Sequence, residues 1–256
     1  MEDQVSRLVD KVWGRYLRTP PDQRVLIAIG GIPGSGKTSL ARAVAAAINQ
    51  KHAEQAGVSG PVGTAEPTEP VATAVPMDGF HLTRAQLSAM PDPVRAHARR
   101  GAEFTFDGAA FLALVERLRT PVEEPDTSGS TSGSVATVLA PSFDHAIKDP
   151  VADAIAIGPR QRIVLFEGNY VCLDKEPWRT ASDAQHMDER WFVDVDFAVA
   201  RARLIQRHIA AGLAADAEAA AARADENDLV NGAEIVAGRV ATIDETIVSR
   251  EDASWS

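Results

Sequence analysis

Short apolar runs alternate with longer stretches of helical periodicity along most of the chain. The runs at 25–29, 162–166 and 191–195 are too short for helices and are bounded by polar or glycine residues, which is typical of buried parallel strands. A further run at 71–77 predicts another strand. Strands that alternate with helices predict an α/β fold with a parallel sheet and right-handed crossovers.

Helices are expected on either side of these strands. Apolar residues at helical spacing predict a helix over 3–18, and the chain from Lys37 is rich in good helix formers. Asp107 is expected to cap a helix that carries apolar residues at the same spacing. Another helix is expected from Asp196 to about Ala211, with a glycine following where a helix C-cap belongs.

Two stretches interrupt this alternation. Residues 53–70 are rich in Gly, Pro and Thr, and residues 121–134 are a low-complexity linker with a strand expected over 135–139. The 256 residues with 45% apolar content suit one large domain over 1–256, in which 1–22 form an N-terminal helical segment.

The strand at 25–29 leads into a complete phosphate-binding P-loop. Its glycines allow successive backbone N–H groups to point at one anion, and the following helix adds the partial positive charge of its N-terminus. Lys37 would reach the β- and γ-phosphates, and the Thr38 hydroxyl would bind Mg²⁺. A glycine-rich turn that binds nothing is the alternative, but strand, loop and helix agree on a nucleoside triphosphate. The loop comprises Gly31, Ile32, Pro33, Gly34, Ser35, Gly36, Lys37, Thr38 and Ser39.

Charge and composition narrow the classes of partner. The net charge of −10 and the lack of a long basic block argue against nucleic-acid binding through a broad basic face, while a local basic site for phosphate stays possible. The single cysteine, Cys172, lies in an apolar run, which favours core packing over a catalytic thiol. The sequence contains neither an apolar stretch of membrane-spanning length nor a signal pattern, so we expect a cytoplasmic protein.

Two carboxylates follow predicted strands. Asp78 comes directly after the strand at 71–77, and Glu167 ends the strand at 162–166, in the form of a Walker-B strand. Because the carboxyl ends of parallel strands face the ligand crevice, Asp78 could accept the proton of an attacking hydroxyl and Glu167 could lie near Mg²⁺. Both residues also precede a glycine, so an ordinary turn is the alternative explanation for each. For Asp78, the turn and the catalytic role carry equal weight.

Arginines gather on the helix that begins at Asp196 and just beyond it. Arg203 and Arg207 lie side by side, Arg201 falls inside the apolar arc, where it needs an anionic or carbonyl partner, and Arg223 follows later. A solvated helix face is the usual explanation. After a P-loop core, these arginines could instead form a lid that closes on the triphosphate and excludes water.

Taken together, these blocks resemble the phosphoribulokinase, uridine kinase and pantothenate kinase family of P-loop kinases, nearest its nucleoside/nucleotide kinase-like branch. The resemblance covers about 25–237. It implies a three-layer P-loop NTPase fold, with helices on both faces of a parallel sheet and a helical lid over 200–230. The blocks that carry it are GGIPGSGKTS, PMDGFHL, RRGAEFTFD, APSFDHAIKDP, IVLFEGNYV and DVDFAVARARLIQRH.

The resemblance also implies roles for single residues. It makes Asp78 the catalytic base, places Glu167 in the Mg²⁺ and acceptor region, and makes Arg203, Arg207 and Arg223 lid arginines. The chain departs from its relatives at Glu103 and in the two inserted stretches, which leaves the acceptor open. Residues in blocks that line the acceptor pocket of such kinases are Phe80, His81, Arg100, Phe104, Phe143, His145, Glu167, Asn169 and Tyr170.

The sequence therefore predicts a monomeric or homodimeric kinase that uses ATP and Mg²⁺ to phosphorylate a hydroxyl of a small metabolite. A nucleoside-like acceptor is favoured, since Phe80, Phe104, Phe143 and Tyr170 could stack on a base, while a sugar or pantothenate stays possible. A nucleotide-dependent switch without an acceptor is the main alternative, and it leaves Asp78 without a role. A kinase-derived protein without activity is a further alternative, against which Lys37, Thr38, Asp78 and Glu167 argue.

Overall fold

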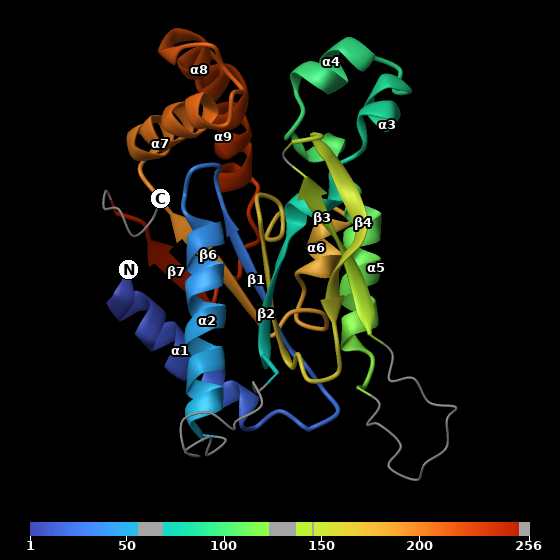
Figure 1. Cartoon of the computed structure of the whole chain (residues 1–256), viewed down its shortest axis with the longest axis vertical. Coiled ribbons are helices and arrows are strands. Elements are labelled where there is room, and N and C mark those ends of the chain that lie inside the picture. The colour runs from blue at the N-terminus through green and yellow to red at the C-terminus, as the bar shows by residue number, and fades with distance from the viewer. Residues whose placement is uncertain (56–68, 123–136, 145, 251–256) are drawn as a thin grey trace, which may run out of the picture.

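The computed structural model describes residues 1–55, 69–122, 137–144 and 146–250. Its centre is a five-stranded, wholly parallel sheet in the order β2-β5-β1-β6-β7 (Figure 1). The predicted parallel sheet is confirmed. The strands are β1 (Val25–Gly31), β2 (Ala72–Pro76), β5 (Ile163–Gly168), β6 (Glu189–Asp194) and β7 (Glu245–Val248).

The strand register aligns the ends that matter for a site. Glu167 of β5 lies opposite Ile29 of β1 on one side and Pro76 of β2 on the other. The chain leaves β1 into the P-loop and leaves β2 toward Asp78, so both segments begin at the edge where Glu167 lies. β1 and β5 are buried along their whole length, which fixes this edge within the core.

One face of the sheet is covered by α1 (Glu2–Tyr16) and α2 (Lys37–Gln55), as Figure 1 shows. The apolar stripe of α1 packs with that of α2 against the sheet because both helices place their apolar residues on one side. Fully buried members of this core are Leu8, Val12, Leu40, Val44, Ile27 and Ile29.

The other face carries α5 (Gly108–Arg119), α6 (Trp178–Ala181) and α9 (Leu229–Ala237). Asp107 caps α5 as expected, its carboxylate accepting a hydrogen bond from Ala110 N at 2.9 Å. Helices therefore cover both faces of the sheet, which confirms the predicted three-layer α/β arrangement. Aromatic and apolar side chains of this second core include Phe111, Trp178, Phe166, Leu26 and Val164.

A two-stranded antiparallel sheet stands apart from the main sheet, beside α5 (Figure 1). It pairs β3 (Val138–Asp144) with β4 (Asp149–Ile157). The strand expected over 135–139 thus begins at Val138 and runs further, and its partner β4 was not predicted. Most side chains of β4 are exposed, so its apolar pattern is too weak to mark a strand.

Two groups of short helices lie above the carboxyl edge of the sheet, one on each side in Figure 1. One group is α3 (Arg84–Ser88) and α4 (Pro93–Ala98), and the other is α7 (Phe197–Ala210) and α8 (Ala217–Arg223) with α9. The 3₁₀ turns are η1 (Met77–Phe80) and η2 (Glu103–Thr105), and a π-helical turn, Ala224–Asp228, joins α8 to α9.

Gly212 follows α7 with a φ of +62°, as its expected role after a helix end requires. Most of the two inserted stretches, 53–70 and 121–134, lies outside the described residues. Among the helices that the structure describes, none has the length and apolar character needed to cross a membrane.

Candidate functional site

The P-loop bridges β1 and α2 at the carboxyl edge of the sheet. Gly34 and Gly36 have φ angles of +79° and +87°, in the region that favours glycine. A Cβ on Gly34 would lie 2.8 Å from the carbonyl oxygen of Ala200 in α7, so the loop also needs glycine for close packing. α2 begins at Lys37, and its N-terminus faces the same loop. The local geometry is that of a phosphate cradle.

The Lys37 side chain brings the charged groups of the site together. Its pKa is lowered, first because the ammonium is buried; Glu167, Asp78 and Asp228 oppose that shift, and Arg207 adds to it. Three carboxylates and one guanidinium therefore act on a single ammonium group. The charges of Asp78 and Glu167 thus both act on the P-loop lysine.

Glu167 is buried beside Thr38. The Thr38 hydroxyl donates a hydrogen bond to Glu167 Oε1 at 3.0 Å. Burial raises the pKa of Glu167, Lys37 opposes the shift, and Asp78 adds to it. The described residues contain no group of three or more His, Cys, Asp or Glu side chains placed to hold a metal. Mg²⁺, however, usually takes one or two protein oxygens together with phosphates and waters, so the Thr38 and Glu167 pair fits that ion.

Asp78 lies in η1, immediately after β2. The 3₁₀ turn is closed by His81 N, which donates to the Asp78 carbonyl at 3.1 Å, and the carboxylate is half-buried. A Cβ on Gly79 would lie 2.3 Å from the carbonyl oxygen of Pro141, so Gly79 is required by packing against β3. Gly79 is thus explained by packing, while the Asp78 carboxylate acts electrostatically on Lys37 and Glu167.

The predicted lid arginines lie at different distances from the P-loop. Arg203 donates to the carbonyl of Gly34 at 3.2 Å and to Ser249 Oγ at 2.8 Å, so it contacts the loop directly. Arg207 is exposed on α7, close enough to influence Lys37. Arg223 is exposed at the end of α8.

Arg201 is paired within the same group of helices. Its guanidinium holds the Asp225 carboxylate with two hydrogen bonds, at 2.7 and 2.8 Å. Arg201 thus has an anionic partner, a carboxylate of the π turn, but the pair is exposed on the outer side of the helices and is not set against an apolar face. Cys172 is buried in the second core, and burial raises the pKa of its thiol to about 12, in agreement with a packing role.

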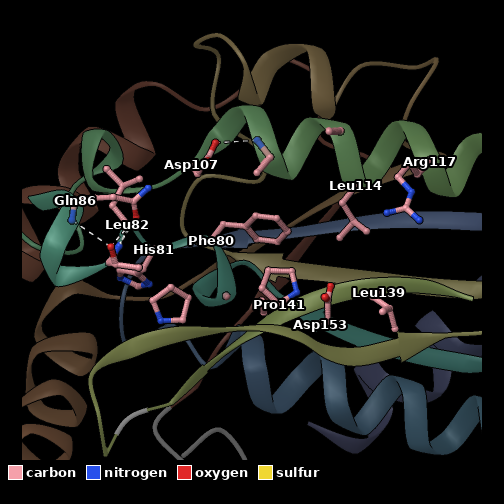
Figure 2. A pocket seen from close by; sticks show the side chains of 16 residues that line it. Phe80, His81, Leu82, Gln86, Asp107, Leu114, Arg117, Leu139, Pro141 and Asp153 are labelled. Carbon is pink, nitrogen blue, oxygen red and sulfur yellow. Dashed lines mark hydrogen bonds between the residues drawn. The ribbon is translucent and has the colours of Figure 1, made fainter.

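A cavity of about 470 Å³ lies beside the turn that carries Asp78. Figure 2 shows Phe80 between the two walls, which are α5 with Leu114 and Arg117 and the β3–β4 hairpin with Pro141. Phe80 and His81, both predicted acceptor-pocket residues, line the end of this cavity next to η1. Neither Asp78 nor any P-loop residue is part of its lining, so the cavity adjoins η1 through Gly79 and Phe80.

Of the other predicted acceptor-pocket residues, Phe143 and Arg100 lie near His81. The Phe143 ring centre is 4.7 Å from that of His81, and the Arg100 guanidinium lies 5.5 Å from the Phe143 ring. Asn169 is half-buried in the turn after β5. Phe104 lies apart, against Arg95. His145 lies outside the described residues.

The four aromatic residues expected to stack on a base do not share one surface. Phe80 packs edge-on against Phe111 in the core. Tyr170 is buried, its hydroxyl donates to the carbonyl of Gly101 at 2.9 Å, and burial raises its pKa. Apolar burial competes with ligand stacking for such rings, and the sequence pattern alone could not separate the two.

Several polar residues of this region were missed. Arg99 donates to Asn227 and Asn231, and Asp228 lies 2.8 Å from His208 through Oδ2 and Nε2. The sequence does offer a signal for these residues. Asparagine and aspartate are poor residues for a helix interior, yet they recur within 225–231.

Comparison with known proteins shows which proteins the chain is similar to. No protein-family model matches the chain. It is 53% identical over 164 residues to the ATP-dependent kinase-like protein notR' of Aspergillus versicolor, covering 64% of this chain and 89% of that protein. It is 40% identical over 210 residues to a protein of Schizosaccharomyces pombe with the provisional name uridine kinase, covering 82% of this chain and 77% of that protein.

Solved structures of proteins described as kinases are also similar to this chain. The chain matches a Silicibacter protein, provisionally described as a kinase of a fructose transport system, with a TM-score of 0.71 and 33% identity over 94% of this chain and 98% of the other. It matches YFH7 of Saccharomyces cerevisiae, described as a P-loop kinase with a circular permutation, with a TM-score of 0.76 and 25% identity over 97% and 99%.

Proposed function

Since the chain belongs to the family of ATP-dependent kinase-like and uridine kinase-like P-loop kinases, we propose that it uses ATP and Mg²⁺ to phosphorylate a hydroxyl group of a small metabolite. The observation that carries the proposal is the meeting of Lys37, Asp78 and Glu167 at one edge of the sheet, beside the P-loop. A phosphate cradle next to an acidic side chain is the arrangement that hydroxyl phosphorylation requires.

The P-loop side holds the triphosphate. The backbone amides of the loop and the N-terminus of α2 bind the phosphate oxygens, and Lys37 neutralises charge at the β- and γ-phosphates. Thr38 and Glu167 would hold Mg²⁺, which would supply charge neutralisation at the triphosphate. Arg203 steadies the loop through Gly34, and Arg207 on α7 and Arg223 on α8 would move toward the transferred group.

Asp78 provides the chemistry on the acceptor. It orients the hydroxyl and takes its proton as the acceptor oxygen bonds to the γ-phosphorus; the bond to the β,γ-bridging oxygen breaks, and ADP leaves with its electron pair. Little other covalent work is needed, because phosphoryl transfer depends mainly on positioning and charge stabilisation. A nucleotide switch without an acceptor would give the Asp78 carboxylate no task.

A nucleoside-like acceptor is favoured among small metabolites. Support comes from the contacting rings of His81 and Phe143, which offer π surface next to η1, and from a relative with the provisional name uridine kinase. The cavity beside η1 has the volume of an ordinary small-molecule site. The description of one structural neighbour as a kinase of a fructose transport system keeps a sugar in the test set, with pantothenate beside it.

The experiment is a screen of ATP consumption against nucleosides, sugars, sugar phosphates and pantothenate, with mass spectrometry of the products. The proposal expects one class to accelerate ADP release and to gain the mass of one phosphoryl group. Asp78→Asn protein, run in parallel, should not give that product. Slow ATP hydrolysis that no acceptor accelerates would favour the switch and contradict the proposal.

A further inference from the structure

The π-helical turn Ala224–Asp228 interrupts an otherwise regular helical run from α8 into α9. Such turns are rare and occur frequently at functional sites, because the extra residue redirects the side chains around it. Here two consecutive residues turn to different neighbours. Asn227 faces the segment after α4, and Asp228 faces α7.

Asn227 holds the acceptor-side segment with two hydrogen bonds. Its Oδ1 accepts from Arg99 Nε at 3.0 Å, and its Nδ2 donates to the Arg100 carbonyl at 3.1 Å. Asn231, one turn later, accepts from Arg99 Nη2 at 2.6 Å. Both asparagines are buried, and bonds from a charged guanidinium to buried amides are costly to break without replacement. We call Arg99, Asn227 and Asn231 the Arg99 clamp.

Arg100, the next residue, connects the same segment to the β3–β4 hairpin. Its guanidinium donates to Asp149 Oδ1 at 3.0 Å and to the Lys148 carbonyl at 2.6 Å, both at the start of the β4 strand. Neighbouring arginines thus join the π turn to the hairpin that walls the cavity beside η1. Gly101, next in sequence, accepts the hydroxyl hydrogen bond of Tyr170 and so fixes the segment to the turn after β5.

Asp228 connects the same turn to the nucleotide side. Its Oδ2 lies 2.8 Å from Nε2 of His208, which is buried on α7, the helix that carries Arg203 and Arg207. Its charge also acts on Lys37, the residue that would meet the triphosphate. The same helix α7 contacts the P-loop, because Arg203 donates a hydrogen bond to the Gly34 carbonyl at 3.2 Å. A triphosphate that reorders the P-loop can therefore act on Asp228 through Arg203, α7 and His208.

We propose that the π turn couples the two halves of the site, with Asp228 as the residue that responds to the triphosphate and the Arg99 clamp as the set of positioning residues that carry the response to 93–106. The acceptor-side segment then takes its working position when the nucleotide is bound. This inference rests on the proposed function, since it requires ATP at the P-loop.

Hydrogen–deuterium exchange tests the coupling with the whole protein and the non-hydrolysable analogue AMPPNP with Mg²⁺. In the wild type, AMPPNP should slow exchange in the P-loop, in α7 and also in 93–106, the last by about fivefold or more, the lower end of ordinary coupling between sites. Arg99→Gln should still bind AMPPNP, weaker than wild type by no more than the coupling factor itself, while 93–106 loses its AMPPNP-induced protection. Arg95→Gln, on α4 just before Arg99, is the matched control and should keep it.

A second pair of variants separates positioning from simple stability. Asn231→Asp keeps an oxygen for Arg99 and should retain the coupled protection, whereas Asn231→Leu should lose it. This pair also decides the matter if Arg99→Gln does not fold. Wild-type protein that binds AMPPNP while 93–106 exchanges unchanged overturns the coupling and leaves the kinase proposal intact. Wild-type protein that does not bind AMPPNP overturns the proposed function, and the coupling with it.

Discussion

The phosphate side and the acceptor side of this site are built in different ways. On the phosphate side, a continuous stretch from Gly31 to Thr38 supplies most of the parts, and Glu167 of β5 and Arg203 of α7 add to it. On the acceptor side, the parts come from η1, from the segment around Arg99 and Arg100, from the β3–β4 hairpin and from the π turn. Backbone conformation makes the first half, and contacts between distant side chains make the second.

Because of this difference, the two halves of the site are expected to control different properties of the reaction. A phosphate cradle made of amides and glycines serves any acceptor, since it does not contact one. A wall assembled from side chains can change its shape through single substitutions, so specificity belongs to that half. We therefore expect substitutions on the phosphate side to stop the chemistry with every acceptor, and substitutions on the acceptor side to alter which acceptor is used.

The largest effect is expected from Lys37→Ala. Losing the ammonium group leaves the developing phosphate charge without its main protein cation, so turnover should fall by roughly a thousandfold or more and ATP affinity should weaken. Steady-state kinetics and calorimetric ATP binding measure both. Lys51→Ala, on the exposed part of the same helix, is the control and should behave like wild type. Near-normal turnover in Lys37→Ala would contradict the proposed role of the P-loop lysine at the phosphates.

Asp78→Asn should come next. Loss of a general base lowers rates by about 10²–10⁴-fold, and because Asp78 acts on the acceptor, ATP affinity should hardly change. The contrast with Lys37→Ala is the informative result. Lys37→Ala should lose both ATP affinity and turnover, whereas Asp78→Asn should lose turnover alone. Asp10→Asn, on the outer face of α1, serves as the control. Turnover close to wild type in Asp78→Asn would show that another group takes the proton.

The same division explains how far the sequence could be read. Strand β1, the P-loop and the cap at Asp107 depend on neighbouring residues, so local pattern predicted them. The contacts of the acceptor side join residues far apart in the chain, as Arg99 to Asn231 and Arg100 to Asp149 do. Phe80 and Tyr170 illustrate the limit, because an aromatic residue beside a site can serve the core as readily as a ligand.

A smaller effect is expected at Arg207. If its guanidinium approaches the transferred phosphoryl group, Arg207→Ala should lower kcat by about tenfold, the loss of roughly 1.4 kcal/mol of transition-state stabilisation, with little change in ATP affinity. Arg201→Ala is the matched control, since Arg201 is paired with Asp225 on the outer side of the helices. Equal rates for Arg207→Ala and wild type would return Arg207 to a solvated helix face.

The smallest effect concerns stability. Burial raises the pKa of Glu167, so the folded state holds its proton more tightly than the unfolded state does. Wild-type stability should therefore fall as pH rises from the ordinary glutamate pKa through the raised one, and Glu167→Gln should lack that fall. The Tm of the variant minus that of wild type should grow with pH over this window, by a few degrees at most. A difference of the opposite sign would mean that the ionised carboxylate stabilises the fold.

The most direct measurement is a crystal structure of the protein with AMPPNP and Mg²⁺. The account predicts phosphates cradled by the P-loop amides, the γ-phosphate between Lys37 and the Asp78 carboxylate, and room for a hydroxyl group beside that carboxylate. It also predicts the metal at Thr38 and Glu167. A γ-phosphate bound away from Asp78, with the carboxylate turned to the far side of η1, would contradict it.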